Sequence, residues 1–566
     1  MTGRNVGLAG LAAVLLAAGP ARGQVPTREL PPAELAAGLT PADLTARVEQ
    51  FAPVDLTFDT SLLDAHQRIV VRKLIEASDV LNEIFWLQVW PDNLSYRSML
   101  EEVGDADLEP ARQYYDIMAG PWDRLADSEP FLAVGPKPAG AGYYPADATR
   151  EEIEGWIAAH PEDREAFTSY YTILEREGDR LVAVPYREAY ADRLERAEGL
   201  FREAAEHAQN VSLADFLGKR AESLVTDDYL ASEIAWMQLS ENLVDVTFGP
   251  YEVYEDALMG WKTAYESFIG IKDPGASADL EVLVSHLPDL EAALPMDDAY
   301  KSPDRSFESP LSVIDVIYTA GDARRGVMTL AFNLPNDPRV SDEYGTKKIM
   351  LRNVIDAKFE KVLVPIAERV LEPALAAEIE PRPFTTNVLM HELAHGLGPR
   401  LVHGSDESIS VRLGASYSPV EEAKADVVGV LSLAHLADAG VYDEAFKRQV
   451  YISSVAGLFR CVRFGTNEAH GKGCAVQLNH LLDTGAIAVG TEGRFGIDFG
   501  KIHAGYESLA RQLLTIEATG DVAGAEGLLA EKGTLPPPVE DAIGRLADVP
   551  VDIRPRYTVI EAMREW

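Results

Sequence analysis

Apolar residues recur every three or four positions along much of this chain, which is the spacing of amphipathic helices. The pattern predicts helices within residues 61–90 and 189–222, and further helices through most of residues 354–440. Glycine and proline cluster at residues 135–145, which indicates a loop between the first two helical segments. The chain is therefore expected to be mainly helical.

Strand-like segments interrupt this pattern in the middle of the chain. Residues 311–318 and 326–332 are short apolar or β-branched runs, which are typical of strands. Residues 535–559 are rich in proline and predict an extended tail. With these strands, the expected fold class is α+β.

The N-terminal segment, residues 1–23, has the pattern of a secretory signal. Arg4 precedes an almost wholly apolar run, residues 6–18, and small residues stand at Ala21 and Gly23. This run is too short for a comfortable membrane span, and no later stretch reaches about 18 uninterrupted apolar residues. The protein is therefore expected to be exported, periplasmic or extracellular, without a stable membrane anchor.

Charge and cysteine content narrow the function further. Among 566 residues, 91 are acidic and 51 basic, which gives a formal charge of −40. Such a surface repels phosphate backbones, so the composition argues against nucleic-acid binding. Two cysteines, Cys461 and Cys474, could form a disulfide in an exported protein or remain buried thiols. They are too few for a cysteine-based zinc site.

The sharpest chemical signal is the sequence HELAH at residues 391–395. It falls in a predicted helix that ends before Gly396, and residues four apart on a helix lie on one face. His391 and His395 can therefore bind one Zn²⁺, and Glu392 can act on the metal-bound water as the general base. Two surface histidines without a metal are the alternative.

The third metal ligand is not supplied nearby. The metzincin class of peptidases places a third histidine ten residues after the first. Leu401 occupies that position here, and His403 stands two residues too late. The third ligand is therefore expected further along the chain.

A second helix, predicted to begin near Pro419 and to end at Gly440, carries suitable acids in its first turns. Glu422 is the expected third zinc ligand. Glu421 and Asp426 are expected to accept ring N–H bonds from the zinc-bound histidines. Acids placed at a helix N-terminus to suit the helix dipole are the alternative.

Together the two helices resemble the zinc site of the dipeptidyl peptidase III family, the M49 metallopeptidases. That family joins a His-Glu zinc helix to a downstream Glu-Glu-x-x-Ala-acid helix. The spacing within residues 391–395 resembles that of the shorter bacterial members, and of the peptidase part of plant proteins that also carry a Nudix domain. No Nudix box is found in this chain. The resemblance extends over residues 249–485.

Three further stretches extend the resemblance. Asn333 and Asn336 match the family's Asn-Leu-Pro-Asn, whose amides hold the substrate backbone and its N-terminal part. His470 matches a histidine that stabilises the charged intermediate, and Glu266 matches the glutamate of Glu-Ser-Tyr, which binds the substrate α-ammonium group. Without the resemblance, the asparagines would indicate only a turn and His470 only a helix start.

This sequence departs from the family at Phe268, where the family has the tyrosine of Glu-Ser-Tyr. Phenylalanine lacks the phenol that hydrogen-bonds the reaction intermediate. Tyr251 or Tyr254 could supply a hydroxyl, and the sequence does not choose between them.

The resemblance implies two lobes with a wide cleft, one lobe helical and zinc-binding, the other containing a small β-barrel. It also implies an exopeptidase with one Zn²⁺ per chain that releases dipeptides from short peptides. An aminopeptidase or oligopeptidase of other cut length is an alternative, and so is a non-catalytic zinc-binding protein. Structural zinc sites usually have four protein ligands, so three ligands beside an intact Glu392 favour catalysis. The oligomeric state stays open.

Pattern and resemblance together predict a division of the chain. After the signal at residues 1–23, the expected parts are a mostly helical region with the start of the β-containing lobe (24–300), a β-rich substrate-anchoring segment (301–345), a helical zinc-binding lobe (346–545) and an extended tail (546–566).

Overall fold

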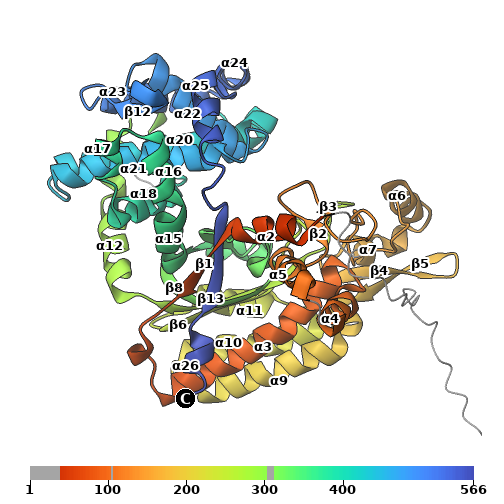
Figure 1. Cartoon of the computed structure of the whole chain (residues 1–566). Coiled ribbons are helices and arrows are strands. Elements are labelled where there is room, and N and C mark those ends of the chain that lie inside the picture. The colour runs from red at the N-terminus through yellow and green to blue at the C-terminus, as the bar shows by residue number, and fades with distance from the viewer. Residues whose placement is uncertain (1–38, 104–105, 302–310) are drawn as a thin grey trace, which may run out of the picture.

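The structure, a computed structural model, describes residues 39–103, 106–301 and 311–566. The expected secretory signal at residues 1–23 lies outside the described residues. Helices predominate and surround one larger sheet (Figure 1), so the α+β, mainly helical prediction is confirmed. Within the described residues, no helix is both long and apolar enough to cross a membrane.

Long helices of the N-terminal half pack beside the sheet. They are α3 (Ala65–Val89), α9 (Ala191–His207) and α10 (Val211–Thr226), and α3 packs against both α9 and the sheet. The predicted helical stretch 189–222 is thus two helices. The break comes at Asn210, whose side chain accepts a hydrogen bond from the backbone N–H of Leu213 and so caps α10.

A five-stranded sheet lies next to these helices. Its order is β6-β7-β8-β10-β9, and only β8 and β10 are parallel. Strands β6 and β9 stand at the two ends and are not paired with each other in the described residues, so a closed β-barrel stays a prediction. The strands are β6 (Val244–Glu252), β7 (Ala264–Lys272), β8 (Leu311–Gly321), β9 (Ala331–Leu334) and β10 (Lys347–Leu351).

The strand predicted at residues 326–332 begins later than expected, at Ala331. Side chains take the backbone groups of Met328. Its N–H donates to Asp552 Oδ2 at 2.6 Å, and its carbonyl accepts from Lys358 Nζ. Because both backbone groups of Met328 are hydrogen-bonded to side chains, this residue does not need a neighbouring strand as its partner.

The C-terminal segment is more structured than the predicted extended tail. Helix α25 (Pro537–Gly544) forms because its prolines stand in the first turn, where the missing N–H costs nothing. Strand β13 (Asp552–Tyr557) then returns to pair in parallel with β1 (Phe51–Leu56). The end of the chain is thus joined to its beginning.

A buried ion pair secures this junction. Lys358 Nζ lies 2.8 Å from a carboxylate oxygen of Asp552, and their side chains are only 3% and 1% exposed. Burial lowers the pKa of Lys358, while the charge of Asp552 opposes that shift. The pair is therefore needed to keep the ammonium group charged.

Asp552→Ala is expected to lower the free energy of unfolding by about 3–5 kcal/mol, because it leaves the Lys358 charge buried and unpaired. Chemical denaturation measures this loss. The double variant Lys358→Met/Asp552→Ala should be more stable than Asp552→Ala alone. A loss below about 1 kcal/mol in the single variant would contradict the role of the pair.

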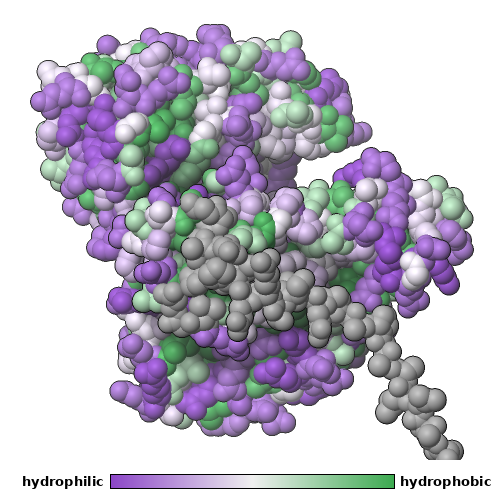
Figure 2. Space-filling view, turned by 45° about the vertical axis from the view of Figure 1, so that its right-hand side comes forward, coloured by the Kyte–Doolittle hydropathy of each residue, from purple (hydrophilic) through white to green (hydrophobic). Residues whose placement is uncertain are grey.

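The C-terminal helices form a second packed body, above the sheet in Figure 1. Helix α20 (Tyr417–Asp438) lies inside it, and Figure 2 shows the surface hollowed between this body and the N-terminal part, which fits two lobes. The surrounding helices are α18 (Pro381–Ala394), α21 (Glu444–Val462), α22 (Ala469–Asp483) and α23 (Ile502–Thr519).

Candidate active site

Helices α18 and α20 come together at the predicted metal site. His391 lies near the end of α18, and His395 is its C-terminal cap. On α20, Gly429 faces the backbone of His391, and a Cβ atom there would lie 3.3 Å from the His391 nitrogen. The absence of a side chain at this position lets the two helices approach closely.

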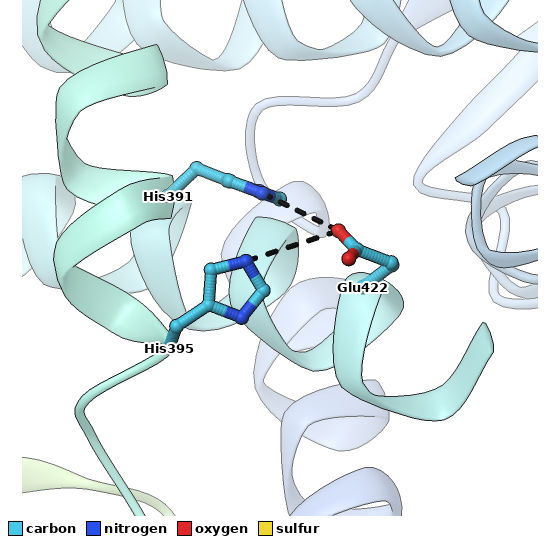
Figure 3. Close-up of side chains that lie close together, drawn as sticks. All are labelled: His391, His395 and Glu422. Atoms are coloured by element: carbon cyan, nitrogen blue, oxygen red, sulfur yellow. Dashed lines mark ion pairs between the residues drawn. The ribbon is translucent and has the colours of Figure 1, made fainter. Parts of the chain in front are cut away.

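The structure brings together the three predicted metal ligands (Figure 3). Glu422 Oε2 lies 3.5 Å from His391 Nε2 and 3.8 Å from His395 Nε2. Across the described residues, these three side chains are the one group of His, Cys, Asp and Glu close enough to hold a metal ion. All three are partly buried.

The other ring nitrogens are already occupied. His391 Nδ1 lies 2.7 Å from Asp426 Oδ1, and His395 Nδ1 lies 2.7 Å from Glu421 Oε1. Carboxylates in these positions fix the ring orientation and direct each Nε2 at the metal. Glu421 and Asp426 thus lie where the sequence predicted.

The residues fit a divalent ion with a preference for nitrogen and oxygen ligands. Glu422 Oε2 is buried and has no hydrogen-bond partner, although it faces both imidazoles. Burial opposes ionisation, but the nearby ring of His391 and the charges of the neighbouring histidines hold the pKa of Glu422 below its usual value. An ionised carboxylate and two directed imidazoles form a three-ligand site.

His391 carries a proton when no ion is bound. Burial disfavours the charged ring, but the charge of Asp426 and its hydrogen bond prevail and raise the pKa of His391 to about 10. A metal ion must displace this proton, since only the neutral imidazole is a ligand.

Asp426→Asn is expected to weaken zinc binding about 10- to 100-fold, because the amide no longer holds His391 in orientation as a carboxylate does. Competition with a chelator of known affinity measures the change. The matched control is Asp438→Asn on the same helix, where the side chain pairs with Lys447 at the surface and zinc affinity should not change. Equal affinities in all three proteins would contradict the role of Asp426.

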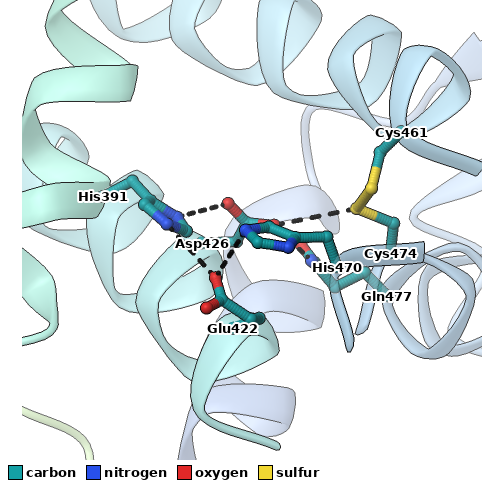
Figure 4. The surroundings of a disulfide bond; sticks show 7 residues. All are labelled: His391, Glu422, Asp426, Cys461, His470, Cys474 and Gln477. Atoms are coloured by element: carbon teal, nitrogen blue, oxygen red, sulfur yellow. Dashed lines mark hydrogen bonds and ion pairs between the residues drawn. A yellow bond between two sulfur atoms is a disulfide. The ribbon is translucent and has the colours of Figure 1, made fainter. Parts of the chain in front are cut away.

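His470 also reaches this site (Figure 4). It stands in the first turn of α22, and its Nε2 lies 3.2 Å from Glu422 Oε2. Its side chain is 63% exposed, so it borders the open side of the site.

A disulfide lies to one side of these residues (Figure 4). Cys461 on α21 and Cys474 on α22 are linked, which decides between the two states that the sequence left open. Cys474 Sγ lies 3.9 Å from Asp426 Oδ2, which also accepts a 2.8 Å hydrogen bond from Gln477. The disulfide therefore joins two helices that line the site.

Glu392, the predicted general base, contacts the other part of the molecule. Lys348 Nζ on β10 lies 3.3 Å from Glu392 Oε2 and 2.6 Å from the Glu392 carbonyl oxygen. The sequence analysis missed Lys348, since it lies far from the motif in the chain. Asn333 on β9 is opposite Lys348 in register, so both side chains share the face turned toward the zinc helix.

Of the three predicted substrate anchors, Asn336 alone lines a cavity of about 480 Å³, which it shares with Tyr251 and Glu252. Burial raises the pKa of Glu252, and a hydrogen bond with Asn336 acts in the opposite direction. Glu266 does not line this cavity and is only 6% exposed.

The stretch that carried Glu266 in the sequence comparison forms part of the core. Phe268 stacks on Phe332 at 4.3 Å between ring centroids. Burial and the nearby acids Asp322 and Glu252 raise the pKa of Glu266 well above its usual value. The sequence did contain a second glutamate-x-tyrosine, Glu252-Val253-Tyr254, and Tyr254 is 73% exposed.

Two imidazoles, a carboxylate and the neighbouring Glu392 on an HExxH helix define a zinc metallopeptidase. The chain belongs to peptidase family M49, whose model matches residues 143–431. The family inferred from two motifs is thus confirmed, and the match reaches further into the N-terminal half than the predicted resemblance.

Solved structures support the same assignment. A dipeptidyl peptidase III from Caldithrix abyssi is 43% identical, with a TM-score of 0.88, over 91% of this chain and 99% of that one. One from Corallococcus sp. strain EGB is 40% identical, with a TM-score of 0.78, over 93% and 99%. Nudix hydrolase 3 of Arabidopsis thaliana is 33% identical over 92% of this chain and 74% of its own length.

Proposed function

We propose that this zinc metallopeptidase releases dipeptides from the N-termini of short peptides. The observation that carries the proposal is the cavity shared by Glu252 and Asn336, which lies at one end of the edge strand β9. An extended peptide can pair with such an edge through its backbone. Its ammonium group would then be held by an acid and an amide, at a fixed distance from the zinc site.

The anchor for that ammonium group is Glu252 in place of the predicted Glu266. Glu252 is at the cavity wall beside Asn336, whereas Glu266 is buried and does not line the cavity. Asn333 and Asn336 hold the substrate backbone. The exposed Tyr254 supplies the phenol that Phe268 lacks, because the hydroxyl of Tyr251 is already bonded to Arg220.

The reaction follows from the residues at the zinc site. His391, His395 and Glu422 would hold Zn²⁺, which lowers the pKa of water and polarises a carbonyl group. Glu392 takes a proton from the attacking water and passes it to the leaving amine. His470 donates a hydrogen bond to the oxygen that gains negative charge. Lys348 positions the Glu392 carboxylate through its ion pair.

Glu252→Gln is expected to raise KM for a dipeptidyl arylamide about 10- to 100-fold, because a charge-assisted hydrogen bond to the ammonium group is lost. Steady-state kinetics measure it. Glu266→Gln is the matched control and should leave KM near the parent value, since Glu266 is buried and does not line the cavity. The reverse pattern would restore the original assignment to Glu266.

The cut position tests the function itself. Digestion of an unmodified hexapeptide, followed by mass spectrometry, should give the N-terminal dipeptide first, and N-acetylation should prevent cleavage. Chelation of zinc should stop the reaction. Release of single amino acids would instead support an aminopeptidase, and internal cuts in the acetylated peptide an oligopeptidase.

We also propose that the protein is exported to the periplasm or beyond, with residues 1–23 removed. The disulfide between Cys461 and Cys474 supports an oxidising compartment. N-terminal sequencing of protein from fractionated cells tests this. A full-length N-terminus in the cytoplasmic fraction would oppose it.

A further inference from the structure

A cavity of about 380 Å³ adjoins the zinc site on the side of α21. His391, Glu392 and His470 line it where the reaction takes place. Its lining also includes Arg460 on α21, next to the disulfide-bonded Cys461. The same cavity is therefore lined by the catalytic residues and by residues outside the zinc site.

Arg460 has no partner of its own in the described part of the chain: its guanidinium group makes neither a hydrogen bond nor an ion pair there. The acids that act on it are Asp552 and Asp426. Asp552 is already paired with Lys358 at 2.8 Å, and Asp426 with His391 at 2.7 Å. Removing a guanidinium group from water without a partner costs free energy, unless a ligand pairs with it.

Two further polar groups of this cavity lack partners. Asn387 Oδ1 on α18, one turn before His391, and Ser453 Oγ on α21 are buried without a hydrogen bond. Native proteins leave few such groups unsatisfied. A ligand with an anionic end and amide groups would satisfy Arg460, Asn387 and Ser453 together.

The two cavities lie near opposite ends of strand β9, along which we propose that the peptide binds. Residues 329–331, just before and at the start of β9, line it, while Asn336 beyond the other end of β9 lines the ammonium cavity. A peptide anchored by its N-terminus at Asn336 therefore runs toward Arg460. Strand β9, Ala331–Leu334, has the length of about four extended residues, or roughly 13 Å.

We propose that Arg460 binds the C-terminal carboxylate of the peptide on the leaving side of the cut, so that peptides of about four residues are preferred. The inference rests on the proposed release of dipeptides. Arg460 would then determine specificity for peptide length. The N-terminal ammonium group of the peptide is bound by an acid, and its C-terminal carboxylate is bound by Arg460. The disulfide fixes Arg460 and His470 relative to each other by joining their helices.

The test compares three peptides: tetra-alanine with a free carboxylate, its C-terminal amide, and an amide with glutamate in the third position. In the parent enzyme, kcat/KM should be about 10- to 100-fold higher for the free acid than for the plain amide. Arg460→Met should bring this ratio close to one. Arg460→Lys should give an intermediate ratio, because it keeps the charge without the planar fork.

The matched control is Arg511→Met, which removes an exposed arginine paired with Glu507 and should keep the parent ratio. A parent ratio near one, or an unchanged ratio in Arg460→Met, would overturn the proposal. So would preference for the glutamate amide over the free acid, since the carboxylate would then belong to a side chain. If Arg460→Met does not fold, the ratio in Arg460→Lys decides.

Failure of the proposed function is a separate result. It would appear as a parent enzyme that releases no dipeptide from any of the three peptides. Calorimetry with zinc-loaded Glu392→Gln would then decide the subsite by itself: tighter binding of the free acid than of the amide supports Arg460, and equal binding overturns it.

Discussion

Replacing Glu392 by glutamine is expected to lower kcat by about 100- to 10,000-fold, while the enzyme keeps its zinc. The amide has the shape of the carboxylate but cannot accept a proton from water. Glu392 is not one of the three grouped side chains that face one another, so the metal site should persist. The two readouts are kcat for a dipeptidyl arylamide and zinc content by atomic absorption.

The matched control is Glu540→Gln, an exposed glutamate of α25, which should leave both readouts unchanged. A Glu392→Gln enzyme that retained more than about a tenth of the parent kcat would contradict the role of general base. Loss of zinc from the same variant would show instead that Glu392 supports the metal.

Glu422→Ala is expected to lose both zinc and activity. Two imidazoles then remain, and the fall in kcat/KM should be at least about 1,000-fold, because the metal supplies several kcal/mol of transition-state stabilisation. Glu422 Oε2 is the atom that both imidazoles and His470 face, so its loss removes the centre of the group.

Zinc content and activity should fall together here, whereas in Glu392→Gln only activity falls. Thermal unfolding serves as the control for folding. The folded protein lowers the pKa of Glu422, so its ionised carboxylate stabilises the fold at neutral pH. The metal-free Glu422→Ala protein should therefore unfold at a somewhat lower temperature than the metal-free parent, but still cooperatively. Full zinc occupancy in Glu422→Ala would contradict ligation by Glu422.

The metal site was predictable from sequence because its geometry is local. Four-residue spacing on one helix sets His391 beside His395, and the same spacing on a second helix sets Glu422 beside Asp426. What the sequence could not give is the approach of the two helices. It depends on Gly429, whose missing side chain has meaning only when the opposite helix is known.

The anchor that we propose, Glu252, was not singled out from the sequence, for a reason that lies in the strand. Glu252 ends β6 after a register shift between Pro250 and Glu252, so alternation along the strand does not tell which way its side chain points. The motif match therefore fell on Glu266, which is buried. In the folded chain Glu266 is buried and Glu252 is only partly buried, and a single sequence carries no signal of this difference.

Contacts between distant segments account for the other differences. Lys348 reaches Glu392 from β10, and Asp552 reaches Met328 from the end of the chain. The proline-rich C-terminal segment was predicted to be an extended tail without a partner. Its strand β13 pairs with β1, which lies at the other end of the sequence. Local patterns predict helices well, but they do not say which distant strand completes a sheet.

Anomalous diffraction at the zinc edge, from crystals of the zinc-loaded protein, tests the metal site most directly. One strong peak is predicted within bonding distance of His391 Nε2, His395 Nε2 and a Glu422 carboxylate oxygen, at about 2.0–2.2 Å. A peak elsewhere, or a fully loaded protein with no peak between α18 and α20, would contradict it.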